Sequence, residues 1–141
     1  MARTTFPVEV LTPEGSVFSS EVEMVSTRTE TGSVGILANH QPLLGLLQPT
    51  ELRLYTGENA YERLAQGEGY VQVAEGRVLL LLEEAFKPEE LDVADLREKL
   101  GKAEAALANA QLGTEEFTRA ARDKRRWEAF IAVAEDSTVG H

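Results

Sequence analysis

Apolar and polar residues alternate in short runs from the N-terminus to about residue 88. In the first runs, Val8, Val10, Val22 and Met24 take every second position. A period of two is typical of β-strands with one buried face, because successive side chains point to opposite sides of a sheet. About eight to ten such runs alternate with turn residues, and this arrangement predicts an antiparallel sandwich or barrel.

Three breaks between these runs carry the residues that favour turns. Pro13-Glu14-Gly15 and Gly57-Glu58-Asn59 each combine residue types that are common in tight turns. Glu75-Gly76 separates two apolar runs by only two residues, so we predict a β-hairpin at this point.

The pattern changes near Lys87-Pro88, after which helix-forming residues and a period near 3.6 dominate. We expect Asp92 to cap a first helix with Asp95 at its third position, and Gly113 to end it. Thr114 is expected to cap a second helix, and each helix has about 20 residues. The apolar stripe of the first helix comprises Val93, Leu96, Leu100, Ala103, Leu107 and Ala110. That of the second comprises Phe117, Ala120, Trp127, Ile131 and Ala134.

These patterns predict a chain of two parts. We expect an N-terminal antiparallel β-sandwich over residues 1–88, followed by a C-terminal antiparallel α-helical hairpin over residues 89–141. Ala103, Ala106 and Ala110 make the helical seam rich in alanine, which buries far less apolar area than leucine. The hairpin is therefore expected to be marginally stable and able to undock from the sandwich.

The composition argues against several function classes. The 141 residues include 14 basic and 24 acidic side chains, and a net charge of −10 disfavours a nucleic-acid partner. Cysteine is absent, which excludes disulfides, thiolate nucleophiles, iron–sulfur clusters and cysteine zinc sites. Apolar runs such as residues 78–82 and 129–134 are far shorter than the roughly 20 residues that span a bilayer. No signal-peptide core precedes the first strand, so we expect a cytoplasmic location without direct membrane insertion.

Candidate catalytic groups are few. The chain has no Gly-x-Ser-x-Gly elbow, and its two histidines nearly exclude an imidazole metal site. We interpret His40 as a loop histidine bonded to nearby backbone. Glu83-Glu84 are interpreted as solvated carboxylates, because neighbouring strand residues point to opposite faces. The Gly32 to Gly35 segment lacks the Lys-Ser or Lys-Thr of a phosphate-binding loop, so an enzyme is the least favoured class.

A basic run on the second predicted helix is the strongest electrostatic feature. Asp123 interrupts it, and its members are Arg119, Arg122, Lys124, Arg125 and Arg126. At about 100° per residue, the first, second and last of these share one helix face. One interpretation is a solvated face that neutralises the acidic first helix. The other is a contact with an acidic protein surface, and the residues alone leave both open.

Two hypotheses follow from the residues. One is a non-catalytic subunit whose sandwich docks on a larger assembly and whose hairpin makes a second, switchable contact. The alternative is an adaptor or chaperone-like module that grips a protein partner with its helices. Stoichiometric copurification with a large complex would favour the first hypothesis.

Residues 32–44 spell a motif, G-x-x-G-I-L-x-x-H-x-P-L-L, which resembles the signature of the epsilon subunit of rotary ATP synthases. The spacing of its glycines, histidine, proline and paired leucines is specific. Residues 7–13 resemble the first strand of that family and residues 67–73 its late hairpin, although Glu68-Gly69 replaces a common Gly-Gly pair. With the two-helix tail, the resemblance covers nearly the whole chain.

The resemblance implies a ten-stranded sandwich and a helical hairpin in the central stalk of the synthase. Such a subunit binds the gamma subunit, rests on the c-ring and couples proton or sodium flow to ATP synthesis without doing the chemistry. It implies peripheral attachment at the cytoplasmic face of the plasma membrane, or at the stromal face of a plastid thylakoid. The loops expected to face the c-ring contain Gly32, Ser33, His40, Gln41 and Pro42. Many members carry an acidic residue in place of Ser33.

The resemblance also implies a regulatory hairpin. In many bacterial members it extends along gamma towards the catalytic alpha and beta subunits, and its basic second helix blocks ATP hydrolysis at an acidic loop of beta. The residues that correspond to this inhibitory contact are Arg119, Arg122, Lys124, Arg125 and Arg126.

Some members bind ATP on the folded hairpin through a motif (Ile/Leu)-Asp-x-x-Arg-Ala. Leu91-Asp92 match its opening, but Asp95 stands at the arginine position. Phe130 stands where a second-helix arginine is expected. Because an aspartate repels a triphosphate, we predict weak or absent ATP binding and no cofactor.

Overall fold

The computed structural model describes residues 3–57 and 59–136. The chain divides into two compact units, Met1–Phe86 and Lys87–His141. The boundary between the two units therefore follows Phe86, two residues before the end at residue 88 that the sequence pattern predicts.

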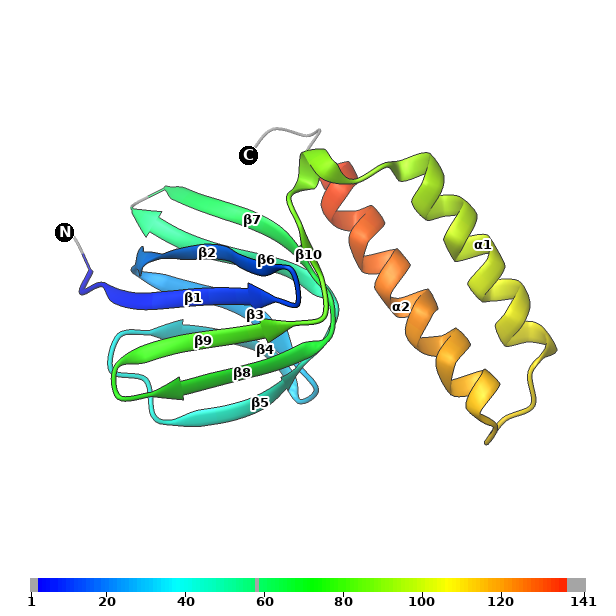
Figure 1. Cartoon of the computed structure of the whole chain (residues 1–141), viewed down its shortest axis with the longest axis horizontal. Coiled ribbons are helices and arrows are strands. Elements are labelled where there is room, and N and C mark those ends of the chain that lie inside the picture. Colours follow the sequence, from blue (N-terminus) through cyan, green and yellow to red (C-terminus); the bar gives the residue numbers. More distant parts are fainter. Residues whose placement is uncertain (1–2, 58, 137–141) are drawn as a thin grey trace. The chain divides into compact units, whose positions relative to one another are not determined.

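The first unit is a β-sandwich of ten strands in one continuous, wrapped sheet (Figure 1). The strands are β1 (Phe6–Thr12), β2 (Gly15–Val22), β3 (Met24–Thr29), β4 (Gly32–Leu37), β5 (Leu43–Leu47), β6 (Thr50–Gly57), β7 (Ala60–Gln66), β8 (Gly69–Ala74), β9 (Arg77–Leu82) and β10 (Ala85–Phe86). Their order is β10-β7-β6-β3-β5-β8-β9-β1-β2, with β4 beside β3. β2, at one end of this order, also contacts β6, so the sheet wraps around one core. The antiparallel prediction is confirmed except at β1 and β9, which pair in parallel.

The alternation predicted from the sequence fills the core. In β1, Phe6, Val8 and Val10 are buried while Pro7 and Glu9 are exposed. Each fully buried side chain of this size stabilises the fold by about 1.5–3 kcal/mol. The buried core comprises Phe6, Val8, Val10, Val22, Val25, Ile36, Leu47, Leu52, Leu54, Leu64, Val71, Val73, Val78, Leu80 and Leu82.

The predicted turns join neighbouring strands. Glu75 and Gly76 both have positive φ, at 52° and 76°, and connect β8 to β9 as the predicted two-residue hairpin. Positive φ at both central residues matches the right-handed twist of the strands. The β1–β2 turn is one residue shorter than predicted and consists of Pro13 and Glu14, because Gly15 already pairs with Thr12. In the predicted turn Gly57-Glu58-Asn59, Glu58 lies outside the described residues.

The second unit is a helical hairpin made of a 3-10 turn (Pro88–Glu90), α1 (Val93–Asn109) and α2 (Glu115–Asp136). Both predicted N-caps are confirmed. The Asp95 backbone N–H donates to the Asp92 carboxylate at 3.2 Å, and the Phe117 N–H donates to the Thr114 hydroxyl at 3.2 Å. The predicted end of α1 at Gly113 is wrong, because the backbone at Ala110 is already extended.

The predicted helical stripes are largely confirmed. Leu96 and Ala103 of α1 are buried, as are Ala120, Ile131 and Ala134 of α2. Two corrections concern neighbouring positions. Ala106 is exposed, and Phe130 and Val133, which the predicted stripe omits, are buried. The last turns of α2 thus bury a wider surface than one narrow stripe.

Candidate functional site

The signature segment forms β4 and the loop that follows it. Among the described strands, β4 pairs only with β3, so its other edge is open. Ser33 and Gly35 are exposed on this strand, while Ile36 is buried in the core. The motif therefore combines an anchoring residue with a free strand edge.

The two segments that were expected to face the c-ring lie at opposite ends of β4, and Gly32 and Ser33 begin this strand rather than lie in a loop. Gly32 pairs with Thr29 at one end of β4, and Leu37 pairs with Met24 at the other. His40 follows Leu37, so it lies beyond the second end. At about 3.3 Å per residue, Gly32 and Leu37 at the two ends of this strand are roughly 17 Å apart.

His40 has the role predicted for it. Its Nδ1 donates to the carbonyl oxygen of Gln41 at 2.6 Å, and its backbone N–H donates to the carbonyl oxygen of Leu37 at 3.2 Å. Because a carbonyl oxygen only accepts, Nδ1 carries a proton. The half-buried His40 therefore stabilises the turn after β4. Gln41 and Pro42 beside it are exposed.

An apolar face lies on the outer side of three neighbouring strands, and it comprises Leu44, Leu46, Tyr70 and Leu81. Leu46 of β5 pairs with Tyr70 of β8, which pairs with Leu81 of β9. These side chains form one row across the sheet because paired residues share a face. They are 41%, 54% and 44% exposed, and Leu44 is 75% exposed. Clustered exposed apolar residues of this kind mark interaction surfaces.

Sequence reasoning did not name these residues, although a signal was present. Residues 43–47 and 78–82 are apolar at both odd and even positions, apart from Gly45. Continuous apolar runs are typical of strands that are covered on both faces. The core covers only one face here, so the second face lacks its cover within the described sandwich.

The five basic residues of α2 do not form a uniform surface. Arg119, Arg122 and Arg125 are exposed, whereas Lys124 and Arg126 are half-buried. Arg126 pairs with Asp123 at 3.0 Å, and its guanidinium lies 4.2 Å from the Trp127 ring centroid. The weaker Arg119 contact with Glu115 spans 3.8 Å between exposed groups.

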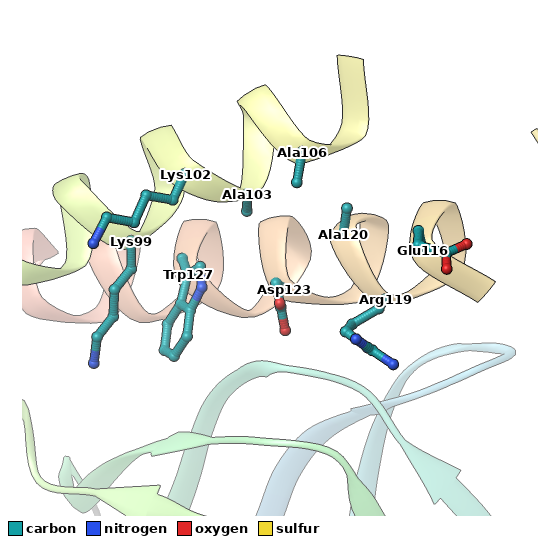
Figure 2. A pocket seen from close by; sticks show the side chains of 9 residues that line it. All are labelled: Lys99, Lys102, Ala103, Ala106, Glu116, Arg119, Ala120, Asp123 and Trp127. Atoms are coloured by element: carbon teal, nitrogen blue, oxygen red, sulfur yellow. The ribbon is translucent and has the colours of Figure 1, made fainter. Parts of the chain in front are cut away.

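The hairpin also carries a groove of about 370 Å³ between its own helices. Figure 2 shows Ala103 and Ala106 of α1 pointing towards Ala120 of α2, and these small side chains leave the space open. Lys99 Nζ lies 5.0 Å from the Trp127 ring centroid at one end. The groove is lined by Lys99, Lys102, Ala103, Ala106, Glu116, Arg119, Ala120, Asp123 and Trp127.

The two positions that bear on nucleotide binding lie outside this groove lining. The Asp95 carboxylate pairs with Lys99 at 3.2 Å. Phe130 is fully buried, with its ring edge-on to Trp127 at 6.0 Å. Neither position offers a guanidinium to a phosphate.

A polar cluster on β6 and β7 stabilises the sheet. Glu51 bridges Arg53 and Arg63, and the Arg53 guanidinium lies 4.8 Å from the Tyr61 ring centroid. The pKa of Arg53 is raised, chiefly by a side-chain hydrogen bond with Tyr55 and also by Glu51, against the opposing effect of burial. Arg53 therefore stays charged, and we assign the cluster to cross-strand pairing.

Other site chemistry is limited in the described part of the chain. Residues 3–57 and 59–136 contain no group of three or more His, Asp or Glu side chains arranged to hold a metal ion. No helix in these ranges has both the length and the apolar character needed to cross a membrane. These features define a class of small two-unit proteins, with an exposed apolar face on a β-sandwich and a basic second helix in a helical hairpin.

Comparisons with known proteins identify the family. Residues 5–88 match the family model of the ATP synthase delta/epsilon chain β-sandwich domain. The chain is 38% identical over 130 residues to the ATP synthase epsilon chain of Persephonella marina, covering 92% of this chain and 96% of that one. It is 40% identical over 107 residues to the epsilon chain of Priestia megaterium, covering 76% and 79%. The protein therefore belongs to the ATP synthase delta/epsilon chain family.

Solved structures share the fold. One is a chain of the Euglena gracilis mitochondrial ATP synthase, with a TM-score of 0.76, 20% identity, and coverage of 96% of this chain and 81% of that one. Another belongs to the central stalk and c-ring of the Tetrahymena thermophila mitochondrial ATP synthase, with a TM-score of 0.60, 18% identity, and coverage of 96% and 98%. The fold of this chain therefore also occurs in these two ATP synthase structures.

Proposed function

We propose that the protein is a non-catalytic rotor subunit of a proton-translocating ATP synthase, which couples ion flow through the c-ring to ATP synthesis. Family membership supports this proposal, and a similar fold occurs in a structure of the central stalk and c-ring of a mitochondrial ATP synthase. The observation that carries it is the apolar face of β5, β8 and β9. A sandwich that transmits torque needs a fixed contact with the central stalk, and burial of exposed apolar area supplies such a contact.

The apolar face is the docking surface for the gamma subunit in this proposal. Four large side chains, Leu44, Leu46, Tyr70 and Leu81, lie there in two neighbouring rows of the sheet. Tyrosine, the residue type at position 70, is enriched among the residues that contribute most of the binding energy of interfaces. Burying them against gamma offsets the cost of ordering both partners.

The test is binding of the full chain to the gamma subunit of the same synthase. The double variant Leu46→Ser/Tyr70→Ser is expected to weaken binding by at least about tenfold, because both side chains lose their buried area. Leu112→Ser is the matched control, since Leu112 is 83% exposed in the hairpin loop and should leave the affinity unchanged. Equal affinities of parent and double variant would contradict this docking surface.

The c-ring contact is proposed to run along the open edge of β4. Gly32 and Ser33 begin β4 at one end of that edge, and the loop with His40, Gln41 and Pro42 follows its other end. Ser33 carries no charge, so it would offer the c-ring a hydrogen bond and not an ion pair.

The hairpin is proposed to inhibit ATP hydrolysis by extending towards the catalytic alpha and beta subunits. Its exposed arginines are Arg119, Arg122 and Arg125, whose positive charges would attract an acidic surface. Arg126 has to leave its 3.0 Å pair with Asp123 to join them. Attachment to the membrane is peripheral in this proposal and occurs through the complex, at the cytoplasmic face or, in a plastid, at the stromal face.

ATP is not proposed as a ligand of the folded hairpin. Asp95 presents a carboxylate where the family motif has an arginine, and Phe130 is withdrawn into the interior. Regulation through this hairpin then depends on protein contacts alone.

A further inference from the structure

A second groove, of about 500 Å³, lies on the sandwich between β1, β2 and β9. Pro7 and Leu79 are among its apolar lining residues. Its charged lining residues are Glu9 of β1, Glu21 of β2 and Arg77 of β9. Pro7 and Glu9 are exposed while Val8 and Val10 enter the core, so the groove opens on the outer side of the sheet.

This groove is continuous with the apolar face. Glu9 pairs with Leu79, Leu79 pairs with Gln72, and Gln72 pairs with Leu44. The four residues therefore form one row across β1, β9, β8 and β5 on the same side of the sheet. A partner segment that covers Leu44 at one end of this row can reach Glu9 at the other.

The charge in the groove is negative. Glu9 pairs with Ser19, and Pro7 pairs with Glu21, so the two glutamates lie diagonally on neighbouring strands. Diagonal neighbours are about 7–8 Å apart, a separation that one guanidinium can bridge. The Thr5 hydroxyl donates to Glu21 at 2.8 Å and holds that carboxylate in place. Arg77 is the only cation in the lining, so one negative charge remains.

We propose that the groove receives a basic side chain from the same partner segment that covers the apolar face. The segment is amphipathic: an apolar stripe covers Leu44, Leu46, Tyr70 and Leu81, and a lysine or arginine at one end enters between Glu9 and Glu21. This inference rests on the proposed docking of gamma on the apolar face, and it adds the chemistry and the orientation of the docked segment. The apolar rows supply affinity, and the glutamates fix which end of the segment lies over β1.

The experiment measures the affinity of the full chain for the gamma subunit at low and at high salt. Glu9→Gln/Glu21→Gln is expected to bind about tenfold more weakly at low salt, because two charge contacts are lost. Its affinity should also change less between the two salt concentrations than that of the parent chain. Glu62→Gln on β7 is the matched control and should behave as the parent. The glutamates that are changed are exposed, so thermal unfolding of the variants should match the parent.

Each outcome separates this inference from the proposed function. If the double glutamine variant binds like the parent at both salt concentrations while Leu46→Ser/Tyr70→Ser weakens binding, the basic contact is overturned and the docking face stands. If the apolar variant also binds like the parent, the docking face fails and this inference fails with it. Glu9→Lys/Glu21→Lys gives a sharper second measurement, since it should repel the basic end and weaken binding more than the glutamine variant.

Discussion

Gln66 shows how one side chain ties distant strands together. Its amide is fully buried, accepts from the Thr27 hydroxyl at 2.5 Å and donates to the Gln48 carbonyl oxygen at 2.7 Å. Thr27 itself is 4% exposed. A buried polar group left without a partner costs about 1–3 kcal/mol, so this small network specifies one pairing of its strands.

Replacing Gln66 tests the network. Gln66→Ala should lower the free energy of unfolding by about 2–5 kcal/mol, because it leaves a cavity and orphans the Thr27 hydroxyl. Chemical denaturation of the full chain measures this change. Gln72→Ala on the exposed side of β8 is the control, with an expected change within about 0.5 kcal/mol. Similar values for the two variants would mean that the buried network adds nothing.

ATP binding is also decided by single residues. The chain should bind ATP with a dissociation constant well above the low micromolar range, because Asp95 repels phosphates and Phe130 offers no charge. Equilibrium binding of ATP to the full chain tests this expectation. A dissociation constant in the low micromolar range would overturn it.

At the scale of elements, close approach of strands restricts what a position tolerates. A Cβ added at Gly69 would lie 1.9 Å from the Leu81 carbonyl oxygen, so β8 and β9 would have to separate. A Cβ added at Gly101 of α1 meets nothing within 4 Å. The two glycines therefore give a matched pair with opposite expectations.

Gly69→Ala should lower the free energy of unfolding by at least about 1–3 kcal/mol through overpacking. Gly101→Ala should raise the stability of α1 by about 0.5–1 kcal/mol, since alanine favours a helix interior. Denaturation of both variants in parallel measures the two changes. Destabilisation by the second variant, or tolerance of the first, would show that the backbone contacts differ from those described.

At the scale of the whole molecule, the prediction concerns inhibition of ATP hydrolysis by the hairpin. Replacing Arg119, Arg122, Lys124, Arg125 and Arg126 with alanine should raise ATP hydrolysis by the parent complex severalfold, because the inhibitory contact loses its charge. Hydrolysis is measured after reconstitution with the full chain, with this variant and with residues 1–88. Equal incorporation with equal rates would leave the subunit a structural coupling element only.

Much of the architecture follows from the sequence alone. Alternation in residues 6–82, the turn Glu75-Gly76 and the caps Asp92 and Thr114 are local features, and each fixes backbone conformation over a few residues. The signature from Gly32 onwards indicates the family in the same way. These signals can be recognised without the tertiary structure, because the hydrogen bonds and the side-chain periodicity behind them involve residues close together in the sequence.

The remaining features depend on tertiary structure. Only the pairing of β5, β8, β9 and β1 brings Leu46, Tyr70 and Leu81 into one exposed row beside Glu9. The two signature segments lie apart because Gly32 and Ser33 begin β4, whereas His40 follows its other end. The basic residues of α2 differ in exposure because Arg126 pairs with Asp123 and lies over the Trp127 ring. Strand order and the choice of partner are set by long-range packing, which brings together residues far apart in the chain and therefore leaves no periodic trace in the sequence.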